Sequence, residues 1–189
     1  MRQPFPATSL GNALALYGAM TAVAAALALV FAPGLRLFAL PTSPLAWPSG
    51  IGAGLGLVAA SRAAERWLPA FRRLGDRMAA QIGPVSRSRA LALAVLSGVG
   101  EEALFRGPLQ VLLGPLLATL LFASLHGLGQ RRLWPWPVFA AVAGGVFAAL
   151  TAQFQSIWPA VAAHVVVNAL NLRRLGARWG DERAPGSHV

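Results

Sequence analysis

The sequence contains no cysteine and no lysine, and only six acidic residues stand against sixteen arginines. The absence of cysteine excludes disulfides, thiolate metal sites and a cysteine nucleophile. Charged residues make up 12% of the chain, whereas hydrophobic residues make up 56%. This composition is too apolar for a soluble domain of 189 residues and predicts a polytopic membrane protein.

The net charge of +10 does not by itself indicate a nucleic-acid partner. The arginines fall in short segments between apolar runs, as expected of loops that flank a membrane. We therefore expect the lipid bilayer to be a partner, and we expect no binding of nucleic acid.

The apolar runs predict an all-α fold, a polytopic bundle of about six transmembrane helices that forms one membrane domain over residues 1–189. We expect the spans at about 10–32, 45–60, 89–113, 116–126, 138–152 and 157–172. This order puts both termini and every arginine except Arg36 and Arg106 on one side of the bilayer. Because positively charged loops stay on the cytoplasmic side, we expect both termini to be cytoplasmic.

Residues 61–89 differ from the rest of the chain because arginines alternate there with large apolar side chains. Phe71, Leu74 and Met78 recur at helical spacing, which predicts a basic amphipathic cytoplasmic segment at the membrane surface. An ordinary cytoplasmic loop is the alternative. Residues 176–189 are expected to form a flexible tail.

Two adjacent carboxylates and a guanidinium stand inside the third apolar run, at Glu101, Glu102 and Arg106. A charge buried in hydrocarbon is costly or changes its protonation state, so such residues usually serve a function. Glu102 and Arg106 are four positions apart and share a helix face, whereas Glu101 is turned about 100° away. We therefore expect Glu102 to pair with Arg106 and Glu101 to be free.

Three further polar residues lie in apolar helices where they can reach Glu101: His126, His164 and Asn168. Proline suits a helix start, so we expect the third helix to run unbroken from about residue 89 to 113 and to end at Gly114. Glu101 then lies ~18 Å from the cytoplasmic end of its helix, and the other three residues fall near the same depth. One polar cluster is therefore geometrically possible.

These residues form three motifs in a fixed order. The motifs are Glu101-Glu102-x-x-x-Arg106, Phe122-x-x-x-His126 and His164-x-x-x-Asn168. Their order resembles the motif set of the CPBP family of intramembrane proteases, which includes the Rce1-type CAAX prenyl endopeptidases and the bacterial Abi proteins. The resemblance covers about residues 88–175, a CPBP-like catalytic core. It implies hydrolysis of a peptide bond within the membrane.

The resemblance also implies a role for each acid. Glu101 is expected to be the general base that activates a water, and Glu102 with Arg106 is expected to brace it. Ser97 and Ser124 lack the sequence context of a serine nucleophile, so we interpret both as small packing residues.

For the other helices, the resemblance implies that His126 positions the water, while His164 and Asn168 polarise the scissile carbonyl and hold the oxyanion. We favour this glutamate mechanism without a cofactor. The alternative is a zinc ion held by Glu101, His126 and His164. Asn171 is either an additional polar contact or an interfacial residue.

Two other functions compete with an intramembrane endopeptidase. One is a non-catalytic membrane binding or immunity protein that retains the polar cluster for packing, and a weaker one is a proton-coupled transporter. A compact, lysine-free chain looks bacterial, which predicts the bacterial inner membrane as its location. The expected substrate is a membrane-associated protein or peptide, and a carboxy-terminal sorting signal, as in a myxosortase-like enzyme, is one candidate.

Overall fold

A computed structural model describes residues 9–31, 38–127 and 131–181. All regular secondary structure in these residues is helical, which confirms the predicted fold class. The α-helices are α1 (Leu10–Phe31), α2 (Ala46–Trp67), α3 (Pro69–Ile82), α4 (Arg87–Leu104), α5 (Gln110–Leu125), α6 (Pro135–Phe154) and α7 (Trp158–Asp181). A π-helical turn, Phe105–Leu109, joins α4 to α5, and a short 3-10 turn, Arg131–Leu133, precedes α6.

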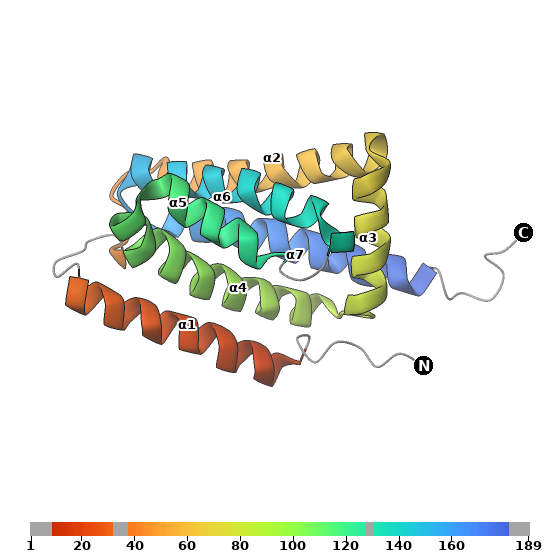
Figure 1. Ribbon diagram of the computed structural model, residues 1–189, viewed down its shortest axis with the longest axis horizontal. Coiled ribbons are helices and arrows are strands. Elements are labelled where there is room, and N and C mark those ends of the chain that lie inside the picture. The colour runs from red at the N-terminus through yellow and green to blue at the C-terminus, as the bar shows by residue number, and fades with distance from the viewer. Residues whose placement is uncertain (1–8, 32–37, 128–130, 182–189) are drawn as a thin grey trace, which may run out of the picture.

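Most of the helices run alongside one another in an elongated bundle, and α3 crosses one end of it (Figure 1). Helix α7 packs against α2, α4, α6 and α3, and α1 packs along α4. The beginning of α1 and the end of α7 lie at the end of the bundle that carries α3. The described chain therefore starts and finishes at the same end of the bundle.

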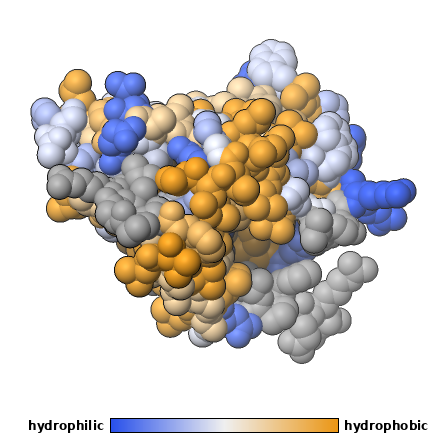
Figure 2. Space-filling model, turned by 60° about the vertical axis from the view of Figure 1, so that its left-hand side comes forward, coloured by the Kyte–Doolittle hydropathy of each residue, from blue (hydrophilic) through white to orange (hydrophobic). Residues whose placement is uncertain are grey.

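Within the described residues, three helical runs are long and apolar enough to cross a membrane: residues 10–31, 87–125 and 135–154. Many large apolar side chains on them are exposed, and Figure 2 shows a broad apolar surface on the face in view. Such a surface suits lipid rather than water. Helices α2 and α7 carry arginines in their second halves and do not meet the same criterion of length and hydropathy. The number of about six spans therefore stays a prediction.

The run from 87 to 125 holds the predicted third and fourth spans, and the chain reverses direction within it (Figure 1). Gly114 adopts φ 79° and ψ 163°, a left-handed conformation that glycine adopts without strain, at the predicted boundary. The prediction of an unbroken helix up to residue 113 is wrong. The helix loses regular geometry earlier, at Gly107 (φ −75°, ψ −114°), because Pro108 cannot donate a helical hydrogen bond.

Two other boundaries differ from expectation. Residues 61–89 contain the end of α2 and all of α3 rather than one continuous segment. Helix α7 continues to Asp181, into the segment predicted to be a tail, and residues 182–189 lie outside the described residues. Arg2 and Arg36, which entered the charge assignment, also lie outside them.

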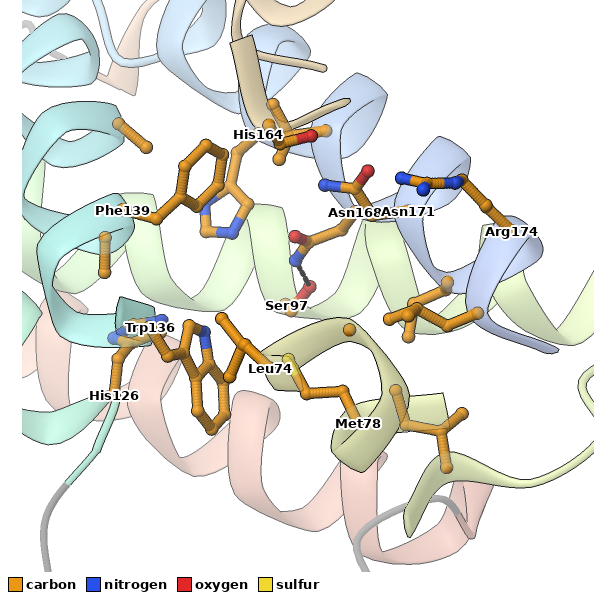
Figure 3. A pocket seen from close by; sticks show the side chains of 18 of the residues that line it. Leu74, Met78, Ser97, His126, Trp136, Phe139, His164, Asn168, Asn171 and Arg174 are labelled. Carbon is orange, nitrogen blue, oxygen red and sulfur yellow. Dashed lines mark hydrogen bonds between the residues drawn. The ribbon is translucent and has the colours of Figure 1, made fainter. Parts of the chain in front are cut away.

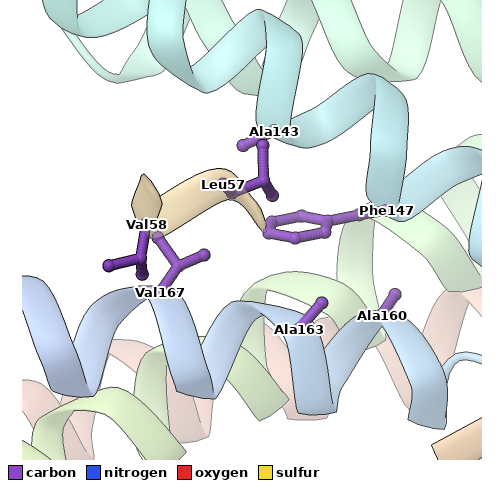
Figure 4. Packing of buried hydrophobic residues seen from close by; sticks show 7 residues of the cluster. All are labelled: Leu57, Val58, Ala143, Phe147, Ala160, Ala163 and Val167. Atoms are coloured by element: carbon purple, nitrogen blue, oxygen red, sulfur yellow. The ribbon is translucent and has the colours of Figure 1, made fainter. Parts of the chain in front are cut away.

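Helix α7 lies in close backbone contact with two neighbours. A Cβ atom at Gly54 of α2 would come within 2.7 Å of the Ala163 carbonyl oxygen, and one at Gly98 of α4 within 2.9 Å of Val165. Only glycine permits such an approach. Next to these contacts lies an apolar cluster shared by α2, α6 and α7 (Figure 4): Leu57, Val58, Ala143, Phe147, Ala160, Ala163 and Val167. Glycines on α2 and α4 therefore allow α7 to pack closely against both helices.

Candidate active site

Side chains from all of the helices α1 to α7 line a cavity of about 430 Å³ in the described part of the chain. Glu101, His126 and His164 meet at one end of it, in the middle of the bundle. The other end reaches Glu65 and Arg174, near α3. The reversal between α4 and α5 brings His126 back to the level of Glu101, so the structure unites residues from three separate helices.

Glu102 and Arg106 form the buried ion pair that their spacing predicts. The Arg106 Nε donates to Glu102 Oε2 over 3.1 Å, and both side chains have zero exposure. Arg106 Nη1 also donates to Thr119 Oγ1 over 3.1 Å, and the guanidinium lies 5.4 Å from the centre of the Phe122 ring. Hydrogen bonds and an aromatic face thus compensate for part of the lost hydration of this arginine, whose Nη2 has no hydrogen-bond partner within the described residues.

Glu102 has a second partner, which the spacing alone does not predict. Its Oε1 lies 2.7 Å from His164 Nδ1. A carboxylate accepts, so Nδ1 carries the hydrogen and Nε2 is the nitrogen that faces Glu101. The His164 ring also stacks on Phe147, with centroids 5.0 Å apart and an angle of 18° between the rings. Glu102 therefore fixes both Arg106 and the orientation of His164.

Glu101 lies between two imidazoles at the inner end of the cavity. Its Oε2 is 3.7 Å from His126 Nε2 and 3.8 Å from His164 Nε2, and its side chain is 12% exposed. Within the described residues this buried oxygen has no hydrogen-bond partner. Both separations exceed a direct hydrogen bond, yet three atoms at this spacing can each contact one small molecule placed among them.

His126 directly follows Leu125, the last residue of α5. Its ring is held through Nδ1, whereas Nε2 is the nitrogen nearest Glu101. Its Nδ1 lies 2.8 Å from the Phe122 carbonyl oxygen, which can only accept. Nδ1 therefore carries the hydrogen, and the Nε2 that faces Glu101 is bare in the neutral ring. Phe122 and His126 are four residues apart and so share a helix face. The Phe122 ring packs on the imidazole with centroids 4.3 Å apart and helps to hold it in place.

Asn168 lines the same cavity, one helical turn beyond His164 (Figure 3). Its amide nitrogen donates to Ser97 Oγ over 2.8 Å. Ser97 precedes Glu101 by four residues on α4, and its hydroxyl donates to Ala94 O over 3.2 Å. Ser97 therefore orients Asn168, which its interpretation as a packing residue did not foresee.

Tyr17, the single tyrosine of the chain, is a site residue that the sequence did not reveal. It lines the cavity from α1, and its side chain hydrogen-bonds Glu101. Helix α1 approaches closely because Gly100, beside Glu101, has no side chain: a Cβ there would come within 2.9 Å of the Tyr17 backbone oxygen. The available signal was a phenolic hydroxyl in a helix whose other polar side chains are Asn12 and Thr21.

A metal ion would use the same atoms. Histidines that bind metals commonly donate their other ring N–H to a carbonyl or a carboxylate, as His126 and His164 do. However, the described residues contain no group of three acidic or imidazole side chains placed to hold a metal ion. The 3.7 and 3.8 Å separations suit a small bridging molecule better than a preformed metal centre.

Comparison with known families identifies the segment that holds this cluster. Residues 85–170 match the family model described as type II CAAX prenyl endopeptidase Rce1-like. This segment is an Rce1-like domain. The match confirms the resemblance that the motif order predicted, and its range lies close to the predicted core of 88–175. No curated protein and no solved structure matches the chain.

The Rce1-like domain contains every residue proposed for the site on α4, α5 and α7. Tyr17, by contrast, precedes it in the sequence. Together, the match and the three apolar helical runs of the described residues support an integral membrane protein with endopeptidase activity in general.

Proposed function

We propose that the protein is a glutamate-dependent intramembrane endopeptidase with Glu101 as its general base. One observation carries the proposal: a buried carboxylate oxygen without a hydrogen-bond partner in the described chain lies 3.7 and 3.8 Å from two oriented imidazoles. An oxygen held in this way is expensive to maintain unless it has a chemical role. The Rce1-like match adds the reaction class.

The orientation of the histidines defines how a water would be held. His126 Nε2 and Glu101 Oε2 both accept, so one water can donate a hydrogen to each and direct a lone pair into the cavity. Attack on a peptide carbonyl carbon forms the new carbon–oxygen bond while the water proton passes to Glu101. The tetrahedral intermediate carries the negative charge on the former carbonyl oxygen.

The charges of the cluster supply the compensating proton. Two carboxylates and the Arg106 guanidinium leave one negative charge, and a single proton on His164 makes the buried group neutral. In that state His164 Nε2 donates to the oxyanion, and the second N–H of Asn168 does the same. Collapse of the intermediate breaks the carbon–nitrogen bond, and Glu101 returns its proton to the leaving amine.

The proposed substrate is a membrane-associated protein or peptide, and we place the enzyme in a bacterial inner membrane because of its compact, lysine-free sequence. The cavity of about 430 Å³ has the size of a small-ligand site, which suits a short unfolded segment such as a carboxy-terminal sorting signal.

The decisive test compares protein termini in cells that carry the native protein or Glu101→Gln. The variant keeps the size of the side chain but removes the base, so we expect cleavage to fall by about 10²–10⁴-fold. Thermal unfolding in detergent checks that the variant still folds. A variant that folds and cleaves at the native rate would remove Glu101 as the base.

The same experiment separates two competing functions. A non-catalytic immunity protein would produce no termini that depend on Glu101. Zinc dependence is tested by treating the native protein with a chelator in proteoliposomes: we expect cleavage to persist, whereas loss with recovery on addition of Zn²⁺ would assign Glu101, His126 and His164 to a metal.

A further inference from the structure

The cavity has two chemically different walls between the catalytic cluster and its outer end. Helix α7 contributes Asn168, Asn171 and Arg174 to one wall. Trp136 of α6 and Leu74 and Met78 of α3 form the facing wall (Figure 3). A ligand in this part of the cavity therefore meets hydrogen-bonding groups on one side and apolar surface on the other.

Asn171 is the group on the polar wall that has no partner. Its side chain is half-buried and lines the cavity, and it makes no hydrogen bond within the described chain. Asn168 differs, because its amide donates to Ser97 over 2.8 Å. A half-buried amide has two donors and an acceptor to satisfy, and a peptide group offers the complementary pair.

The spacing along α7 fits an extended peptide. His164 and Asn171 are seven residues apart on one helix face, which corresponds to a rise of about 10.5 Å. An extended chain advances roughly 3.3 Å per residue, so Asn171 lies beside a peptide group about three residues from a carbonyl held at His164. Leu74 and Met78 face that position across the cavity (Figure 3).

The outer end of the cavity does not demand a charged ligand. Arg174 and Arg178 both bond Glu65, and Arg178 also pairs with Asp76, so two carboxylates balance two guanidiniums. A free carboxylate or phosphate would have to displace these pairs. The observations therefore favour an uncharged segment with apolar side chains.

We infer that this two-walled part of the cavity is a peptide-binding subsite that selects the substrate. It takes an extended, uncharged segment whose main chain bonds Asn171 and whose side chain, about three residues from the cleaved bond, packs against Leu74 and Met78. The inference rests on the proposed endopeptidase function. Helix α3 is then part of the substrate site and sets the size of the accepted side chain.

The test uses the full-length protein in liposomes with a library of peptides, each carrying one apolar anchor helix and a randomised segment beside it. Mass spectrometry of the products gives the residue preference at each position. The wild-type protein should enrich large apolar residues three positions from the cleaved bond. Met78→Ala should admit larger residues there, and Met78→Phe should favour smaller ones.

Leu91→Phe is the matched control, because Leu91 is 54% exposed on α4 and does not line the cavity. Its preference should equal that of the wild-type protein. If both Met78 variants cleave with the wild-type preference at every position, the subsite is wrong while the endopeptidase stands. A lipid chain against the apolar wall would give this same result and would also overturn the inference.

Asn171 is tested with a chemical change in the substrate. Asn171→Leu is close in size and should lower kcat/KM by about tenfold, the effect of one lost hydrogen bond. Replacing the facing peptide N–H by an ester oxygen should impair the wild-type enzyme but leave the variant unaffected. Equal losses in both proteins would overturn the contact.

The proposed function fails in a different way. In that case no library member is cut by the wild-type protein, or Glu101→Gln cuts as well as the wild type. Either result removes the subsite together with the reaction, whereas the results for Met78 and Asn171 concern the subsite alone.

Discussion

Two ion clusters lie at opposite ends of the same cavity, and they differ in how far their charged groups are exposed and paired. At the outer end, Glu65 and Asp76 pair with Arg174 and Arg178, and these side chains are between 16% and 45% exposed. At the inner end, Glu102 and Arg106 have zero exposure, and the neighbouring Glu101 keeps an oxygen without a hydrogen-bond partner in the described chain.

The comparison separates a cluster that holds helices together from the cluster to which we assign the chemistry. The outer pairs connect α2, α3 and α7, and water can replace each lost partner. The inner cluster is poorly hydrated, so every charge depends on a fixed neighbour. An unpaired carboxylate oxygen at this place is explained if another molecule, such as a water, donates a hydrogen bond to it.

The largest difference is expected in stability. Arg106→Met removes the partner of a fully buried carboxylate, and we expect the free energy of unfolding to fall by about 3–5 kcal/mol. The double variant Glu102→Leu with Arg106→Met should regain part of that loss, because no uncompensated charge remains. Unfolding in detergent micelles measures both, and equal stability of Arg106→Met and wild type would end the distinction between the clusters.

The next effect is expected in the reaction rate rather than in stability. Asn168→Leu removes a donor to the oxyanion, so kcat should fall by about 10²–10³-fold. Ser97→Ala leaves the amide in place but frees its orientation and should have a smaller effect. Single-turnover cleavage in proteoliposomes measures both. A larger loss for Ser97→Ala than for Asn168→Leu would contradict these roles.

A smaller effect is expected at Tyr17. Tyr17→Phe removes the hydroxyl that bonds Glu101 but keeps the ring that lines the cavity. One hydrogen bond contributes about 0.5–1.5 kcal/mol, so kcat should fall by about two- to tenfold. Phe38→Leu, a conservative change at a residue outside the cavity lining, is the control for altered packing near α4. An unchanged kcat would show that α1 only packs against the site.

The smallest effect is expected at the outer cluster. Arg174→Met breaks a partly exposed pair, so the free energy of unfolding should fall by less than about 1 kcal/mol. The difference between variant and wild type should shrink further in high salt, because ions screen exposed pairs. A loss as large as that of Arg106→Met would mean that both clusters hold the fold equally.

The sequence predicted those parts of the site that depend on helical spacing. Four positions separate Glu102 from Arg106 and Phe122 from His126, and both pairs are in contact. The chain also breaks at Gly114, as glycine followed by proline predicts. Local rules were sufficient because each of these features lies within one helix or at its end.

Contacts between helices were not predictable in the same way. Nothing in the spacing indicates that Glu102 bonds His164, or that Tyr17 reaches Glu101 from α1. An amphipathic pattern such as that of α3 fits a membrane surface and a cavity wall equally well, and tertiary packing places Leu74 and Met78 at the cavity. Pro108 marks the early break at Gly107 in the sequence, but a helix boundary there would place His126 far in depth from Glu101, which favoured the boundary at Gly114.

The close backbone fit of α7 against Gly54 and Gly98 has a consequence for how the protein is made. Ribosomes synthesise the chain from its amino end, so Tyr17, Glu101 and His126 enter the membrane before α7 exists. His164 and Asn168 arrive with that last described helix, which Gly54 and Gly98 allow to pack closely against α2 and α4. On the proposed mechanism the nascent chain carries the base without its oxyanion donors, so cleavage would start only when α7 is in place.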